Sequence, residues 1–341
     1  MSVCRRLFSS CPARKQIVSA IQPTGEPHLG NYLGALKQWV SLQDQHDNCV
    51  FGLADNHVFT SKITAKQVRQ NTLKQTAVLL SLGLDPDKVI LYKHSAVLQH
   101  TALAWLLSTA ATSGLISKLR MLPQYKEKSQ VHDNLGLLTY PVLMSADILL
   151  FHGTHIPVGE DQNIHIEFCN SIAQYFNRAY KCEVFQTVSQ LLTTSPRVKS
   201  LADPSLKMSK SYGKASGVIG MLDTDDQIRK KVKKAVTDSF GPITVDQDER
   251  PGVYNLLLLL SAVSDTHFRE VCRKYEYRNV VELKNDLSEC LVGTVGPVRD
   301  RALELLGDIG YVEKVLSVGA EKASEIAEKN LDSIYRTIGL K

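Results

Sequence analysis

The sequence predicts an α/β protein in which a doubly wound parallel sheet precedes a helical domain. In the first half, short apolar runs that end in turn residues alternate with segments of helical periodicity, and after Pro204 the strand signal disappears. Such alternation is typical of a parallel sheet with helices on both faces. With 341 residues and 43% hydrophobic content, the chain can bury the cores of two such units.

Each element of the first half is predicted from a local signal. Three strands are predicted from short apolar runs at residues 16–22, 49–54 and 88–94. The helix after the first strand has apolar residues at helical spacing: Leu29, Leu33, Leu36 and Val40. Thr64 and Gln67 form a capping box before a helix that should stop at Gly83. A further strand ends at Gly159, and Asp161 should cap the helix after it.

The second half is predicted to be helical. Asp223 should cap a helix whose apolar face includes Ile228 and Val232. The last helix carries an apolar stripe formed by Ala323, Ala327, Leu331, Ile334 and Ile338. The longest apolar run, residues 253–263, is shorter than the roughly 20 residues of a membrane helix. It predicts a buried core helix, and no membrane partner is expected.

The formal charge of +5 is concentrated at the N-terminus. Residues 1–25 contain no acid, and they carry four basic residues: Arg5, Arg6, Arg14 and Lys15. Taking these four from the 40 basic residues leaves 36, against 35 acidic ones. The acid-free, Arg- and Ser-rich stretch 1–15 is typical of a mitochondrial transit peptide, which predicts a location in the mitochondrial matrix. A disordered tail is the alternative interpretation.

The cysteines predict neither a disulfide framework nor a metal centre. Beyond the first fifteen residues five remain, an odd number without a C-x-x-C pair: Cys49, Cys169, Cys182, Cys272 and Cys290. This favours free thiols in a reducing compartment. His152, His155 and His165 lie near Cys169 in the sequence, but their spacing fits no common zinc pattern.

The first chemical motif is PTGEPHLGN, residues 23–31, which follows the first strand and opens the first helix. A glycine turn at a helix N-terminus lets backbone N–H groups approach a phosphate, and the helix dipole assists. His28 adds a donor, and Gly30 permits flat contact with a base or ribose. Taken alone the motif is weak evidence, because such turns also simply connect strands to helices.

A second motif, LKMSKSYGK, lies at the predicted domain boundary, residues 206–214. It combines lysines and hydroxyls at five positions: Lys207, Ser209, Lys210, Ser211 and Lys214. These groups suit a clamp on a polyphosphate, although a solvated linker would also explain them singly. A third motif, IPVGEDQ at 156–162, places acids at the carboxyl end of a strand, where doubly wound folds bind ligands.

Together these motifs resemble the paired signatures of class I aminoacyl-tRNA synthetases. HLGN at 28–31 and KMSKS at 207–211 stand in the family's order. The segments LLTYPVLMSADILL, IPVGEDQ, AVTDS and PGVYNLL narrow the resemblance to tryptophanyl-tRNA synthetases of the bacterial and mitochondrial type. The resemblance implies a Rossmann-like catalytic domain at 16–205, a KMSKS loop at 206–215 and a helical anticodon-binding domain at 216–341, whose last helix can pack back on the catalytic domain.

The resemblance also implies a reaction. L-tryptophan would be activated with ATP to tryptophanyl-adenylate and pyrophosphate, and tryptophan would then pass to the 3′ end of tRNA(Trp), with a homodimer as the working form. The substrate carboxylate is already ionised at neutral pH, so no general base is needed. Catalysis should therefore consist of positioning and of stabilising the charge that grows on the leaving phosphates.

By similarity, the site residues fall into three groups. The leaving phosphates would be stabilised by Lys207, Ser209, Lys210 and Lys128, with Mg²⁺ bridging phosphate oxygens. ATP would be held by Gln22, His28, Gly30, Asn31, Gly159, Glu160, Asp161 and Val198, and by Lys207, Met208, Ser209, Lys210 and Ser211 of the loop. In the tryptophan pocket Asp147 would accept from the indole N–H. The walls around the ring would be Met144, His57 and Val18. The ammonium group would be bound by Tyr140 and Gln162.

Asp147 is the most informative of these residues because it lies in the otherwise apolar stretch 137–151. A buried carboxylate is expensive unless hydrogen bonds or charge compensate it. Indole is an apolar plate with one N–H donor, and the resemblance places Asp147 on that N–H. The alternative is an aspartate that caps its own helix.

Two rival functions share parts of this pattern. A tyrosyl-tRNA synthetase has the same fold and chemistry, but the MSAD and GEDQ stretches fit the tryptophan enzymes better. A catalytically dead relative that acts as a binding protein would not need the signature residues that are intact here. Ala20 and Tyr212 depart from the family's usual glycine and acid, so contacts that depend on those two positions are in doubt.

Overall fold

The computed structural model describes residues 15–120, 125, 134–159, 162–192, 198–208 and 215–341. At its centre is one sheet of five parallel strands in the order β3-β2-β1-β4-β5. The strands are β1 (Ile17–Ile21), β2 (Cys49–Leu53), β3 (Ile90–Lys93), β4 (His155–Val158) and β5 (Ser189–Leu192). The order reverses between β1 and β4, as in a doubly wound sheet, so the predicted fold class is confirmed.

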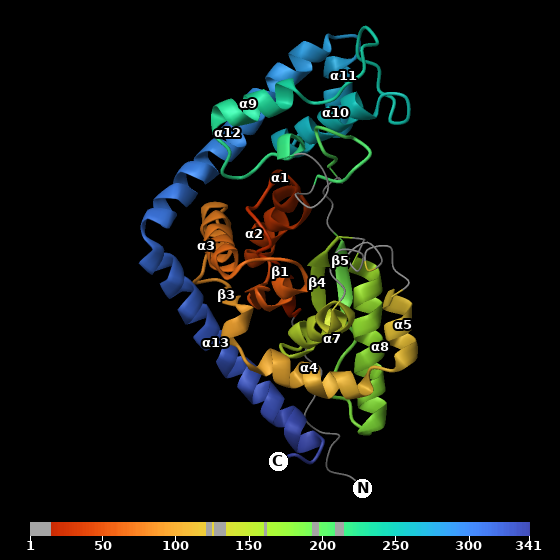
Figure 1. The fold of residues 1–341 in the computed structure, drawn as a ribbon, viewed down its shortest axis with the longest axis vertical. Coiled ribbons are helices and arrows are strands. Elements are labelled where there is room, and N and C mark those ends of the chain that lie inside the picture. The colour runs from red at the N-terminus through yellow and green to blue at the C-terminus, as the bar shows by residue number, and fades with distance from the viewer. Residues whose placement is uncertain (1–14, 121–124, 126–133, 160–161, 193–197, 209–214) are drawn as a thin grey trace.

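The helices of the first half flank this sheet or pack on the helices that flank it (Figure 1). They are α1 (Leu29–Asn31), the π-helical η1 (Tyr32–Leu36), α2 (Lys37–Gln43), η2 (Asn56–Thr60), α3 (Ala65–Ser81), η3 (His94–Ala96), α4 (Gln99–Ala110), α5 (Ser113–Arg120), α7 (Leu135–Leu149) and α8 (Asn163–Ala179). The capping box of Thr64 and Gln67 is confirmed, and Gly83 follows α3 with a left-handed φ of 98°. Helix α8 has Gln162 at its N-cap, one residue later than predicted; Asp161 lies outside the described residues.

The second half is helical, as predicted. It contains η5 (Ala215–Gly217), α9 (Asp225–Lys233), α10 (Pro251–Ser264), α11 (Phe268–Tyr275), α12 (Val280–Gly307) and α13 (Ile309–Thr337). The cap predicted for α9 was wrong: Thr224 caps the helix, because its hydroxyl and the Gln227 side chain satisfy each other's backbone N–H groups. Asp223 instead accepts from the backbone N–H of Gly220 and from Lys231.

The apolar run at 253–263 forms the buried helix α10, with Val253, Leu257 and Leu259 fully shielded from solvent. Within the described residues no single helix is both long and apolar enough to cross a bilayer. The helix pair α4 and α5, bent by 105°, meets the length and composition criteria.

The last two helices bend along one side of the molecule, and α13 returns beside the sheet (Figure 1). Helix α13 packs on β3, the edge strand, and its buried residues Ala320, Ala323 and Ala327 belong to a core cluster that also contains Tyr92 of β3. Gly319 makes the closest approach, since a Cβ there would lie 1.8 Å from the carbonyl oxygen of Leu91 in β3. The absence of a side chain at Gly319 therefore lets a helix cover the edge of the sheet.

Gly319→Ala should destabilise the protein. The added methyl meets backbone that belongs to the sheet, so helix and strand must separate, and overpacking of this kind costs ~1–3 kcal/mol. We expect the melting temperature to fall by about 1–4 °C in a thermal scan. Gly293→Ala is the matched control, because that glycine is exposed in α12 with no atom within 4 Å of the added Cβ. An equal fall in both variants would contradict the packing role of Gly319.

Candidate active site

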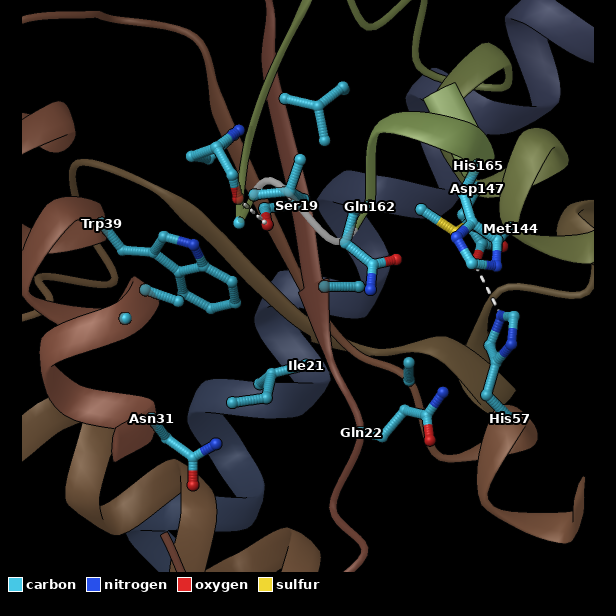
Figure 2. A pocket seen from close by; sticks show the side chains of 18 of the residues that line it. Ser19, Ile21, Gln22, Asn31, Trp39, His57, Met144, Asp147, Gln162 and His165 are labelled. Carbon is cyan, nitrogen blue, oxygen red and sulfur yellow. Dashed lines mark hydrogen bonds and ion pairs between the residues drawn. The ribbon is translucent and has the colours of Figure 1, made fainter. Parts of the chain in front are cut away.

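A cavity of about 580 Å³ opens at the carboxyl ends of β1 and β4, where the strand order reverses. This is where doubly wound sheets bind ligands. Figure 2 shows Asn31 and Trp39 at one end, Gln162 near the middle, and Asp147 with Met144 at the other end. The cavity is long enough to offer two differently lined ends.

Most of the predicted site residues that the structure describes line this cavity. They are Val18, Gln22, Gly30, Asn31, His57, Tyr140, Met144, Asp147, Gly159, Gln162, Val198, Lys207 and Met208. The others lie outside the described residues: Lys128, Glu160, Asp161, Ser209, Lys210 and Ser211. His28 stands beside the cavity as the N-cap of α1.

The HLGN turn is held by a reciprocal cap. The His28 ring accepts from the backbone N–H of Asn31 at 3.3 Å, and the Asn31 side chain accepts from the backbone N–H of His28 at 3.1 Å. At Gly30 a Cβ would lie 3.0 Å from the His28 ring and 3.1 Å from the Met208 carbonyl oxygen. Gly30 thus allows the two signature motifs to approach each other.

Backbone hydrogen bonds join each motif to a neighbouring segment. Leu29 N–H donates to the Ile219 carbonyl at 2.8 Å, and Met221 N–H donates to the Pro27 carbonyl at 2.9 Å. Met208, whose side chain is buried, donates its N–H to the Val198 carbonyl at 3.1 Å. Residues 219–221, which follow the second motif, are therefore bonded to the turn that carries the first motif, and Met208 is bonded to Val198.

Asp147 meets histidines in this structure. Its Oδ2 accepts from His57 Nε2 at 2.8 Å, and its Oδ1 accepts from His94 Nε2 at 2.5 Å. His100 Nδ1 also lies 2.8 Å from Oδ1, although its N–H direction falls outside good hydrogen-bond geometry. These four residues, all buried, are called the Asp147 cluster below. Figure 2 shows His57 facing Asp147, joined by a dashed line.

The contacts fix where the protons lie. A carboxylate oxygen can only accept, so the imidazole nitrogens that face it must carry hydrogen. His100 Nε2, on the other side of that ring, lies 2.9 Å from the Tyr92 hydroxyl. With Nδ1 protonated, Nε2 accepts from this hydroxyl, and a chain runs from Tyr92 through His100 to Asp147.

Electrostatics keep the carboxylate charged. Burial raises the pKa of Asp147, but the three facing histidines outweigh it and hold the pKa well below its usual range. Burial lowers the pKa of His94, yet the negative charge of Asp147 prevails and leaves that pKa raised. For His100 burial prevails, so its pKa is lowered. The cluster thus presents an ionised acceptor inside an apolar wall.

The raised pKa of His94 should depend on Asp147. In Asp147→Asn the burial of His94 persists and the larger of the two opposing charges is gone, leaving that of Asp55, so the pKa of His94 should fall. Titration of the imidazole ring protons by NMR measures this, with His94→Gln to assign the signal. A pKa of His94 that stays raised in the asparagine variant would contradict the assignment.

The cluster has the composition of a metal site, and in the described part of the chain it supplies one group with suitable spacing: His57, His94 and Asp147. The nitrogen–oxygen distances of 2.5 and 2.8 Å are those of direct hydrogen bonds. Two ligands around a tetrahedral zinc would stand about 3.3 Å apart, given bonds near 2.0 Å. The geometry therefore fits a hydrogen-bonded carboxylate.

Asp147 does not cap its own helix, and that alternative was wrong. The residue stands near the carboxyl end of α7, whose N-cap is Asn134. A helix N-terminus needs an acceptor, whereas the carboxyl end presents carbonyl oxygens that a carboxylate cannot bind. Nearby, the Tyr140 hydroxyl lies 2.7 Å from His165 Nε2, and both residues line the cavity.

Sequence reasoning missed three residues of this site: Tyr92, His94 and His100. A sequence signal could have found His94, because this residue directly follows β3 and so lies at the carboxyl edge that forms the site. His100 needed the tertiary structure, since only the turn through η3 brings α4 back to Asp147.

Comparison with known proteins gives the family. A family model described as tRNA synthetases class I (W and Y) matches residues 13–294. The chain is 38% identical over 330 residues to the tryptophan–tRNA ligase of Rickettsia conorii, covering 96% of this chain and 99% of that protein. It is 39% identical over 343 residues to the mitochondrial tryptophan–tRNA ligase of Caenorhabditis elegans, covering 98% and 94%. The chain belongs to the class I tryptophanyl-tRNA synthetases.

Solved structures of tryptophanyl-tRNA synthetases agree in fold. The enzyme of Mycoplasma pneumoniae matches with a TM-score of 0.85 at 30% identity, covering 96% of this chain and 98% of that one. The enzyme of Campylobacter jejuni, solved with ADP and tryptophan, matches with a TM-score of 0.80 at 31% identity, covering 95% and 99%. The family resemblance inferred from the signature motifs is confirmed, and this synthetase is an enzyme of class I.

Proposed function

We propose that this synthetase activates L-tryptophan with ATP and transfers it to the 3′ end of tRNA(Trp). The observation that carries the choice of amino acid is the ionised Asp147 carboxylate at the apolar end of the cavity. Indole needs apolar walls and one acceptor for its N–H, and Val18, Met144 and Asp147 supply them. His57 contributes a further wall and also donates to Asp147. Tyr140 and Gln162 would bind the ammonium group.

ATP would occupy the other end. Gln22, Gly30, Asn31 and Met208 line the cavity and would hold ATP, and Gly159 and Val198, which also line it, would contact the adenosine. The substrate carboxylate attacks the α-phosphorus without a general base, because it is already ionised. Lys207, together with Ser209, Lys210 and Lys128, would stabilise the departing pyrophosphate.

Mg²⁺ would enter the site bound to the phosphate oxygens of ATP. Mg²⁺ prefers six oxygen ligands and usually binds through substrate phosphates with one or two carboxylates. The one group with metal-ligand spacing in the described residues offers two nitrogens and lies at the tryptophan end. That group does not fit Mg²⁺, so the ion would be carried mainly by the nucleotide and would neutralise charge there.

ATP–pyrophosphate exchange with each amino acid tests the proposal. Exchange should depend on L-tryptophan and be weak with L-tyrosine. Exchange driven by tyrosine would favour the tyrosyl enzyme, and no exchange with any amino acid would favour a catalytically dead relative. The relatives at 38–39% identity are tryptophan–tRNA ligases, which supports the first outcome.

We further propose that the enzyme acts in the mitochondrial matrix. Support comes from the basic, acid-free stretch 1–15, whose residues up to 14 lie outside the described ones, and from the similarity to a mitochondrial ligase. A chain that begins at Lys15 should activate tryptophan normally but remain in the cytosol. Import of that shortened chain into mitochondria would contradict the targeting role.

A homodimer would be the working form. Exposed apolar side chains on and beside α4, Leu98 at 74% and Trp105 at 72% exposure, are compatible with such an interface. Light scattering after gel filtration measures the mass.

For tRNA(Trp), the helical domain offers the basic residues Lys230, Lys233 and Lys234 around α9, whereas Lys231 pairs with Asp223. The anticodon would be bound on this domain.

A further inference from the structure

The Asp147 cluster contains two histidines to which the proposed reaction gives no role. We infer that His94 and His100 are positioning residues that hold the Asp147 carboxylate with Oδ2 toward the indole N–H, and so set the selectivity for tryptophan. This inference rests on the proposed contact between Asp147 and the indole.

The two carboxylate oxygens have unequal surroundings. An ionised carboxylate offers about four acceptor positions over its two oxygens. Oδ1 faces two nitrogens, from His94 at 2.5 Å and His100 at 2.8 Å. Within the described residues Oδ2 has one partner, His57 at 2.8 Å. One acceptor position therefore remains on Oδ2, and Asp147 lines the cavity.

The histidines fix the plane of the Asp147 carboxylate. The terminal torsion of an aspartate is broad and nearly twofold, so the side chain alone does not fix it. His94 donates to Oδ1 and His100 Nδ1 faces the same oxygen at 2.8 Å. Rotating the carboxylate out of its present plane would remove both contacts, so the plane is fixed with one oxygen in the protein interior. Oδ2 is then presented to the ligand in one orientation.

Burial, ring stacking and a hydrogen bond restrain the imidazole rings of His94 and His100. His94 and His100 have no exposed surface, and their rings stack at 3.9 Å between centroids. The Tyr92 hydroxyl, 2.9 Å from His100 Nε2, keeps the other nitrogen protonated toward Asp147. Tyr92 itself fits over Gly52 of β2, where a Cβ would lie 3.2 Å from the hydroxyl. The position of Tyr92 in the sheet thus restrains His100, and His100 in turn restrains the carboxylate of Asp147.

Selectivity between tryptophan and its benzothiophene analogue, which lacks the N–H, tests the inference. The readout is the ratio of kcat/KM for the two amino acids in ATP–pyrophosphate exchange. His94→Ala and His100→Ala should lower this ratio about tenfold or more, as is usual when an outer partner of a ligand-binding group is lost. Most of the loss should lie in KM for tryptophan. His94→Gln, which keeps an N–H donor, should retain most of the ratio.

His267→Gln, at an exposed histidine of the helical domain, is the matched control and should leave the ratio unchanged. Asp147→Ala distinguishes the proposed indole contact from the positioning role of His94 and His100. If it leaves the ratio unchanged, the proposed indole contact is wrong. If it collapses the ratio whereas His94→Ala and His100→Ala keep the wild-type value, the contact stands and the positioning role is overturned.

Tyr92→Phe keeps the test decisive if the alanine variants do not fold. It removes one hydroxyl and preserves the packing of the ring, so the melting temperature should change little. Loss of the bond to His100 should lower the selectivity ratio by a few-fold. A folded phenylalanine variant with the wild-type ratio would contradict the chain from Tyr92 to Asp147.

Discussion

Replacing Lys207 with alanine should lower kcat for adenylate formation by about 10²-fold or more, the range found when a group that stabilises developing charge is removed. Lys207 lines the cavity next to Met208, whose backbone packs against the Gly30 turn. Its charge matters most as pyrophosphate departs, so the loss belongs to the transition state. Lys210, which lies outside the described residues, should behave in the same way. Steady-state kinetics of ATP–pyrophosphate exchange measure the effect.

KM for tryptophan should hardly change in these variants, because the amino acid is proposed to bind at the other end of the cavity. Lys199→Ala is a useful control, since Lys199 pairs with Lys207 in an isolated antiparallel bridge but does not line the cavity. It should retain kcat within a few-fold. A rise in KM for tryptophan with unchanged kcat would mean that the lysines of the loop are misassigned.

Asp147→Ala should abolish most of the discrimination between tryptophan and the benzothiophene analogue. The wild type should bind the analogue poorly, because doing so leaves a desolvated carboxylate position without a donor. In the variant the indole N–H loses its acceptor, which costs ~1–3 kcal/mol and more where the lost partner is charged. The kcat/KM for tryptophan should therefore fall steeply, whereas the analogue should be nearly indifferent.

The structure adds a second consequence to this substitution. Asp147→Ala leaves His57, His94 and His100 without their shared acceptor, so a lower melting temperature is expected alongside the loss of discrimination. Asp147→Asn, which keeps the shape and one acceptor oxygen, separates the two effects. Equal losses for tryptophan and the analogue in both variants would refute a role of Asp147 in recognising the indole.

Local structure, such as helix starts and buried helix faces, was predicted well from the sequence. Thr64 with Gln67 predicted the start of α3, and the four-residue steps from Ala323 to Leu331 predicted the buried face of α13. Caps were harder, because several acceptors stand close together: Thr224 took the place predicted for Asp223, and Gln162 took the N-cap of α8. A one-residue shift in a cap changes little in the energy of the isolated segment.

By itself, the sequence determined the family, the parallel sheet with its helical second half, and most of the cavity, because these rest on ordered motifs and on periodicity within short segments. Only the tertiary structure decided what surrounds Asp147. His57, His94 and His100 stand 90, 53 and 47 residues before it, and three separate elements bring them to one carboxylate. The tertiary structure also decided that α13 packs closely on the backbone of Leu91 at Gly319. Such contacts leave no periodic trace in the chain, because they arise where distant segments fold to the same point.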